Sequence, residues 1–245
     1  MTRFVWPAMF GVAVLTGTWI TEHRSKNRAL ARKGCLFGLT GGILGARAWY
    51  SAQYGIGSSG MSCYGFIAGV VVVGALYWRF HAGRTPMGDV PDAAAPAILL
   101  GGALVRIGCF IHGCCYGKPS NLPWAVSYGP ATPAYRSQLD QALIQDFAPS
   151  SLPVHPTQFY EALFAAALGV IMLIMGRNLR LPRHCLCLLT VALYAVFRFF
   201  VEFIRGDAGG FYIGPLTFAQ ATSVIVLATA LAVMSWRIRV EAERT

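Results

Sequence analysis

The sequence predicts an all-α integral membrane protein, because of its composition, its long apolar segments and the placement of its basic residues. Of 245 residues, 56% are hydrophobic and only 12% are charged, a combination typical of polytopic membrane proteins. Seven segments approach the length of about 20 apolar residues that crosses a bilayer. We expect one transmembrane domain, 1–245, with seven helices at 4–20, 35–54, 61–80, 93–111, 158–175, 186–203 and 213–236.

The distribution of basic residues predicts how these helices are oriented. Thirteen of the 20 lysines and arginines lie in the connections 21–33, 79–92 and 176–184 and in the C-terminal tail, whereas four lie on the opposite side. The positive-inside rule then places the N-terminus outside and the C-terminus in the cytoplasm. The net charge of +10 is therefore a topology signal and an attraction to anionic lipids, and we expect no nucleic-acid partner.

Three arginines, Arg47, Arg106 and Arg198, lie inside predicted spans, each near the outward end of its helix. A charge within the bilayer is costly, so such residues are by default candidates for a functional site. Other polar residues gather at the same depth: Tyr64, Glu161, Thr217 and Gln220 in other spans, and Glu202 in the span of Arg198. The sequence therefore predicts one polar site near the outer-leaflet boundary.

The polar residues at this depth favour a site for an anion. Two sets share a helix face: Tyr194, Arg198, Glu202 and Arg205 on one predicted helix, and Gln158 with Glu161 on another. Arginine stays charged and holds phosphate oxygens in a bidentate fork, and the anion at this depth is a phospholipid phosphate. Two simpler interpretations stay open: Arg198 pairs only with Glu202, and Arg47 and Arg106 only extend to interfacial water.

The longest connection, 112–157, is predicted to form a small outer cap between the fourth and fifth helices. It contains amphipathic pieces such as YRSQLDQALIQDF and is too short for a sizeable core of its own. Its closing stretch, LPVHPTQFYEALF, brings His155 to the start of the fifth helix, where Pro156 suits the first turn. We expect this cap to be partly helical and to cover the polar site.

Four stretches follow one another along the chain: GAR with GMSCYG (45–47 and 60–65), VRIGCFIHGCCYG (105–117), HPTQFYE (155–161) and YAVFRFFVEFIRGD (194–207). In this order they resemble four motifs of the bacterial prolipoprotein diacylglyceryl transferase family. These are GAR with GGMSFHG, GRxGNFxNGExxG, HPxQxYE and FRxxxEFxRxPD. Gln220 and Ser223 also match a Gln-x-x-Ser pattern in the last span. The resemblance covers nearly the whole chain.

The resemblance implies an enzyme that moves the diacylglyceryl group of phosphatidylglycerol to a lipobox cysteine of an exported lipoprotein precursor, releasing glycerol phosphate. It implies a bacterial cytoplasmic (inner) membrane location with the site facing the periplasm, and we expect no cofactor and no metal. Arg106 and Arg198 would hold the phosphate and stabilise the leaving group. The expected catalytic positions are Arg106, Arg198, Tyr64, His155, Cys109 and His112. The expected substrate-binding positions are Arg47, Tyr116, Gln158, Glu161, Tyr194, Glu202, Arg205 and Gln220.

The chain departs from the family signature around the reacting atoms. Tyr64 stands where GGMSFHG has histidine, and Cys109, His112 and Cys114 stand where the signature has Asn, Asn and Glu. A tyrosine, with a pKa of about 10, is a poor base at neutral pH, so we expect His155 or His112 to take that role. The arginines are retained while the acceptor stays open.

The cysteines at the predicted outer end, Cys63, Cys109, Cys114 and Cys115, allow several interpretations, whereas Cys35, Cys185 and Cys187 are interpreted as small apolar fillers. The outer set suits close helix packing, a disulfide, a Cys/His metal site with His112, or a thiol that takes part in catalysis.

Two other function classes compete with lipid transfer. A membrane thiol–disulfide oxidoreductase would use the outer cysteines, but it leaves the three arginines and HPTQFYE without a role. A small-molecule transporter is disfavoured, because transport sites tend to lie near the bilayer midplane between repeated halves. The polar residues here are off-centre, and the sequence shows no repeat.

Overall fold

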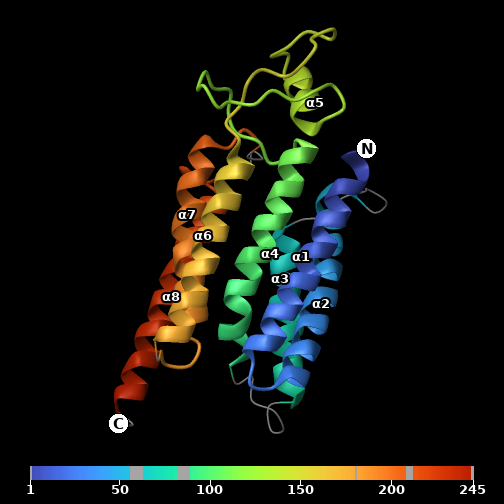
Figure 1. Ribbon diagram of the computed structural model, residues 1–245. Coiled ribbons are helices and arrows are strands. Elements are labelled where there is room, and N and C mark those ends of the chain that lie inside the picture. The colour runs from blue at the N-terminus through green and yellow to red at the C-terminus, as the bar shows by residue number, and fades with distance from the viewer. Residues whose placement is uncertain (1, 56–62, 82–88, 180, 208–211, 244–245) are drawn as a thin grey trace. The chain divides into compact units, whose positions relative to one another are not determined.

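The computed structural model describes residues 2–55, 63–81, 89–179, 181–207 and 212–243, and these residues are mostly helical (Figure 1). The chain forms two compact units, Met1–Gly17 with Ala95–Thr245, and Thr18–Ala94. Two helices, α1 (Thr2–Arg24) and α4 (Val90–His112), contribute residues to both units. Each unit is described by itself below.

The larger unit is built on α4, α6 (Thr157–Asn178), α7 (Cys185–Val201) and α8 (Phe218–Ala242). A 3-10 turn, η1 (Glu202–Ile204), extends α7. Among the described residues, four helices are long and apolar enough to cross a membrane, namely α4, α6, α7 with η1, and α8. A buried apolar cluster joins three of them, α4, α6 and α7, and consists of Leu99, Ala103, Ala165, Leu168, Met172 and Leu186.

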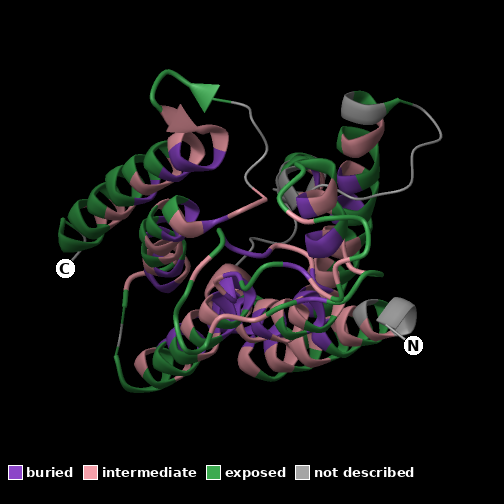
Figure 2. Ribbon diagram, turned by 90° about the horizontal axis from the view of Figure 1, so that it is seen from above, coloured by how far each residue is buried: buried purple, intermediate pink, exposed green. Residues whose placement is uncertain are grey.

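The outer faces of these helices are apolar. Ile98 of α4, Phe200 of α7 and Ile225 of α8 are each more than 60% exposed. Figure 2 shows α8 exposed along most of its length, and its first turns carry the buried residues Ala219, Gln220 and Ser223. Apolar side chains on the outside and polar ones inside are the pattern expected where lipid replaces water.

The last predicted span was placed too early. Residues 213–217 were expected to be helical, but Tyr212–Ile213 (β1) pairs with Leu216–Thr217 (β2) in a two-stranded hairpin. Gly214, with φ of +61°, makes the turn, and Pro215 suits a turn better than a helix interior. The helix begins only after Thr217, whose hydroxyl accepts from the Gln220 backbone N–H while the Gln220 side chain accepts from the Thr217 N–H.

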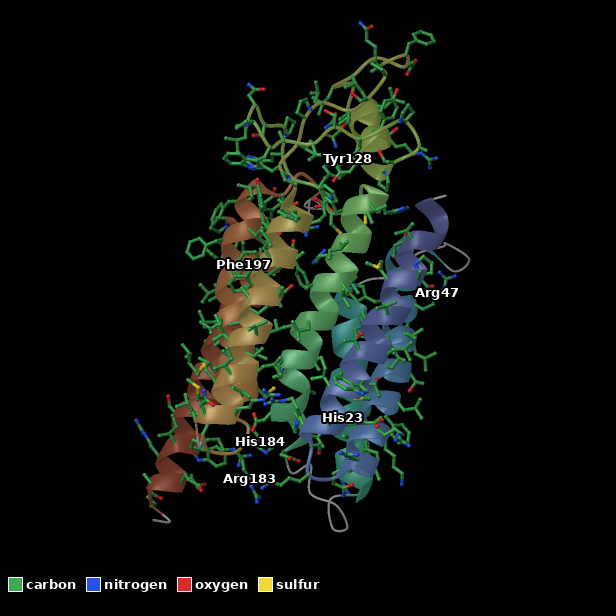
Figure 3. All side chains as sticks on the ribbon, viewed as in Figure 1. His23, Arg47, Tyr128, Arg183, His184 and Phe197 are labelled. Atoms are coloured by element: carbon green, nitrogen blue, oxygen red, sulfur yellow. The ribbon has the colours of Figure 1, made fainter. Side chains whose placement is uncertain are left out.

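The connection between α4 and α6 forms the cap. It holds one short helix, α5 (Pro133–Asp140), which starts at the Thr132 cap, and a small core of Tyr116, Tyr128, Ala134 and Val154. In Figure 3, Tyr128 of the cap lies at one end of the larger unit, and Arg183 and His184 lie at the opposite end. The cap and the basic connection before α7 are therefore separated by the length of the helices.

The smaller unit packs α2 (Arg28–Tyr54) against α3 (Cys63–His81) through glycines. A Cβ atom on Gly69 would lie 2.0 Å from the Gly41 carbonyl oxygen, and one on Gly45 would lie 2.2 Å from the Gly65 oxygen. Small residues let helix backbones approach closely, as is common in membranes. Among the described residues, helices overlap the predicted segments, with bounds that differ by up to seven residues.

Gly69→Ala tests this glycine contact. The added methyl must push α2 and α3 apart because its neighbour is backbone, so we expect a loss of about 1–3 kcal/mol of stability. Gly74→Ala is the matched control in α3, since nothing lies within 4 Å of a Cβ there. Thermal unfolding of the purified protein in detergent measures both. Equal midpoints for the two variants would contradict the close contact.

Candidate functional site

Three of the quoted motifs meet through their backbones at the cap end of the larger unit. Gly117 donates its N–H to His155 O at 2.9 Å, and Lys118 donates to Ile204 O at 2.8 Å. Gly206 donates to Tyr116 O at 3.0 Å. The end of VRIGCFIHGCCYG therefore lies between the start of HPTQFYE and the end of FRFFVEFIRGD.

This junction requires glycine at position 117. A Cβ atom there would lie 2.5 Å from His155 Cβ and 2.8 Å from Ile204 O, distances that force a backbone to shift. The absence of a side chain is what allows three chain segments to pack side by side. The last glycine of the 105–117 motif thus has a packing role.

Glu161 is the centre of a buried charged network. Its side chain, on the first turns of α6, is only 2% exposed. One carboxylate oxygen lies 2.5 Å from Arg106 Nε of α4, and the other lies 3.0 Å from Arg205 Nη1. A buried carboxylate is costly unless it is paired, so the three residues fix one another.

A second carboxylate, Glu202, joins Arg198 to the start of α8. Arg198 Nη1 lies 2.5 Å from Glu202 Oε2, and the Thr217 hydroxyl donates to Glu202 Oε1 at 3.1 Å. Arg205 Nε is 3.9 Å from the same glutamate. The i,i+4 pair expected from the sequence is therefore present, but it belongs to a network that spans α7, η1 and the α8 cap.

Arg205 connects the two halves of this network and adds Asp207, whose oxygens lie 2.7–3.0 Å from the guanidinium nitrogens. Burial acts to lower the pKa of Arg205, but Asp207, Cys115 and Glu161 outweigh it and raise the pKa above its usual value. Burial raises the pKa of the Asp207 carboxyl, although Arg205 opposes this rise. Arg205 is consequently a permanent cation in the site.

The turn after α4 gathers three cysteines. The side-chain sulfurs of Cys109, Cys114 and Cys115 all lie within 4.8 Å of one another, and none of them is in a disulfide. His112, in the last turn of α4, is not part of this group. The Cys/His arrangement weighed from the sequence is therefore a group of thiols alone.

Two fully buried residues of α6 hold this cysteine turn. The Gln158 side-chain amide donates to Cys114 O at 2.7 Å and to Tyr128 Oη at 3.2 Å. The Thr157 hydroxyl donates to Cys115 O at 2.7 Å. Gln158 was predicted to bind substrate, but its NH₂ group is engaged in positioning the turn.

The thiols of the turn differ in acidity. Hydrogen bonds from Cys109 and Cys114 lower the pKa of the Cys115 thiol well below its usual value, and Arg106 and Arg205 act in the same direction. Hydrogen bonds with Cys109 and Cys115, together with burial, raise the pKa of the Cys114 thiol. A thiolate at Cys115 is the nucleophilic form of the group.

A cavity of about 400 Å³ opens beside this turn. Its lining includes Cys114, Cys115, Tyr116, Ser137 and Asp207. Burial raises the pKa of the Tyr116 hydroxyl. The predicted substrate-binding position Tyr116 therefore lines a cavity, although most of its side chain belongs to the core of the cap.

The other predicted residues fall in different surroundings. His155 packs its ring against Tyr160, and its buried Nδ1 has no hydrogen-bond partner among the described residues. Gln220 is occupied by the α8 cap, and Tyr194 packs beside the core of α4 and α6. Arg47 is an exposed residue of α2 in the smaller unit. The Tyr64 side chain lies outside the described residues.

The sequence reasoning missed Asp207, Thr217 and Thr157 as site residues. Asp207 ends the FRFFVEFIRGD motif two residues after Arg205, so its position was visible in the sequence. Thr217 was noted only for its depth, and its contact with Glu202 depends on the hairpin before α8. Nothing in the sequence indicated that Thr157 would hold the Cys115 carbonyl.

Apolar membrane-length helices with a buried arginine–carboxylate network at one end define a helical membrane protein with a charged site. A family model described as prolipoprotein diacylglyceryl transferase matches residues 5–236. Three relatives are named phosphatidylglycerol–prolipoprotein diacylglyceryl transferases. That of Dehalococcoides mccartyi is 32% identical over 200 residues, covering 80% of this chain and 70% of the relative.

The relative from Clostridium tetani is 29% identical over 219 residues, covering 83% of this chain and 81% of the relative. The relative from Xanthomonas oryzae pv. oryzae is 32% identical over 221 residues, covering 81% of this chain and 73% of the relative. The chain therefore belongs to the prolipoprotein diacylglyceryl transferase family, and the resemblance seen in its motifs is confirmed.

Glu161→Gln tests whether the buried network holds the larger unit together. The amide keeps the size of the side chain but leaves Arg106 and Arg205 without their shared anion, so we expect a loss of about 3–5 kcal/mol. Glu22→Gln is the control, because its pair with Arg32 is on the surface and should have no measurable effect. Thermal unfolding in detergent compares the two. A Glu161→Gln midpoint equal to that of Glu22→Gln would refute the central role of Glu161.

Proposed function

We propose that this protein is a membrane transferase that moves the diacylglyceryl group of phosphatidylglycerol to the cysteine thiol of an exported prolipoprotein. The observation that carries this proposal is the buried network in which Glu161 and Glu202 orient Arg106, Arg198 and Arg205. Membership of the family and the printed names of the relatives supply the substrate class.

The arginines have the chemistry that the departing phosphate needs. In this transfer a thiolate attacks the glyceryl carbon, and glycerol phosphate leaves with the electrons of the C–O bond. Arg106 and Arg198 hold the phosphate oxygens, because a guanidinium has five N–H donors and one glutamate does not occupy them all. Groups fixed in advance stabilise charge without reorganising during the reaction, which is the role of Glu161 and Glu202.

The site functions at the outer leaflet of the bacterial inner membrane. Seven spans with the N-terminus outside would put the cap on the outer side and the basic connection 176–184 in the cytoplasm. The separation of Tyr128 in the cap from Arg183 and His184 at the other end of the larger unit supports this orientation.

The assay that tests the function uses the purified protein in vesicles of phosphatidylglycerol with a peptide carrying one lipobox cysteine. We expect a thioether-linked diacylglyceryl peptide, detected by mass, together with an equal amount of released glycerol phosphate. A peptide with serine at the same position should give neither. If the cysteine peptide stays unmodified while the protein is folded, the proposed acceptor is wrong.

Arg106→Lys and Arg198→Lys test the phosphate clamp within this assay. Lysine keeps the charge but loses the planar fork, so we expect the transfer rate to fall by about 100-fold or more, the usual cost of losing one transition-state donor. Arg136→Lys, at an exposed position of α5, is the matched control and should retain full activity. Full activity in both site variants would exclude the clamp.

A further inference from the structure

The three-thiol cluster of Cys109, Cys114 and Cys115 is not explained by the phosphate site. Cys109 lies in the last turn of α4 and is 5% exposed. Gly113, with φ of +77°, then reverses the chain, and Cys115 adopts φ of +60°. A residue other than glycine in this left-handed region is strained, and the strained turn brings Cys114 and Cys115 back beside Cys109.

The spacing of the sulfurs suits a soft metal ion. Zinc binds thiolates at about 2.3 Å in tetrahedral geometry, which places ligand sulfurs about 3.8 Å apart. The three sulfurs already lie within 4.8 Å of one another, so small side-chain rotations complete the set. A disulfide would use only two of them, whereas thiolate ligands favour zinc and other soft metals and such an ion uses all three.

The surroundings of the cluster meet one further need of a metal site, which is a turn fixed in place around its ligands. Gln158 and Thr157 fix the carbonyl groups of Cys114 and Cys115, so the ligand-bearing turn is held before an ion binds.

The cluster also has room for one more ligand. Cys114 and Cys115 line the cavity of about 400 Å³ beside the turn, together with Tyr116, Ser137 and Asp207. Zinc sites with three protein ligands keep a fourth position open for water or substrate. Here the cavity offers that position to a side chain that enters from the cap.

We propose that Cys109, Cys114 and Cys115 bind a zinc ion whose open fourth position takes the acceptor cysteine as its thiolate. This inference rests on the proposed transfer function and assigns the step that activates the acceptor. It explains how the acceptor thiol can lose its proton although Tyr64 stands where the family has histidine. A thiol bound to a metal loses its proton without a strong base.

The step balances as a simple displacement. The acceptor thiol releases its proton to water in the cavity and binds zinc through sulfur. The sulfur then attacks the glyceryl carbon, the S–C bond forms, and the C–O bond breaks, so that glycerol phosphate leaves with the electron pair beside the arginines. The product is a neutral thioether, a weaker ligand than a thiolate, and it dissociates from the zinc.

The first experiment measures the metal directly in the purified full-length protein. Zinc content after dialysis should be about one ion per chain, and replacement by Co²⁺ should give the strong thiolate-to-cobalt absorption. Cys109→Ser, Cys114→Ser and Cys115→Ser should each lose both signals. Cys187→Ser, at a half-buried position in the first turn of α7, is the matched control and should keep them. Protein without zinc, or with a disulfide that consumes two of the three thiols, overturns the proposal.

The second experiment tests the open position. The lipobox cysteine peptide should shift the cobalt absorption and the serine peptide should not; an unchanged spectrum with the cysteine peptide overturns the proposal.

Zinc removal from the unmutated protein by a chelator should abolish transfer, and added zinc should restore it. Transfer that continues without zinc rejects the metal site but leaves the proposed function standing. A peptide that binds cobalt without ever forming the thioether supports thiol binding and rejects the proposed function.

Discussion

The pairing of buried Glu161 with Arg106 and Arg205 is the interaction on which the rest of the larger unit depends. A carboxylate that is 2% exposed among apolar helices cannot remain charged without nearby cations. The two arginines come from α4 and from the segment after η1, while Glu161 comes from α6. One charged group therefore determines how three separate parts of the chain meet, and Arg205 extends the network to Glu202 and Asp207.

A backbone junction beside this network, centred on Gly117, holds the segments of the site together. Gly117 lets the cysteine turn lie between the 153–155 and 204–206 segments, and Gln158 with Thr157 anchors the turn to α6. The 105–117 motif thus carries both Arg106, in the last two turns of α4, and the three cysteines.

Figure 3 shows that the cap and the basic connection before α7 lie at opposite ends of the larger unit. Tyr128 of the cap lies at one end of the larger unit, and Arg183 and His184 lie at the other. Backbone hydrogen bonds join the cap to the 204–206 segment, which carries Arg205. Charged side chains in the intermediate length of the helices would face lipid at a high cost. The polar chemistry is consequently confined to the end where cap residues and helix termini supply hydrogen-bond partners.

The sequence by itself determined the helical membrane class, the approximate positions of the helices and the family, and it placed Arg106, Arg198, Glu161 and Glu202 at one depth. The length of apolar segments, the helical spacing of residues and the order of motifs are properties of the linear sequence, so they need no knowledge of tertiary contacts. Only the tertiary structure decided that Arg205 joins both glutamates and that Gln158 and Gln220 serve the turn and the helix cap. The same holds for the hairpin before α8 and for the three cysteines, which gather without His112. Such outcomes depend on contacts between residues far apart in sequence. They also depend on backbone turns at Gly113, Cys115 and Gly214, whose conformation does not follow from the periodic pattern of apolar residues.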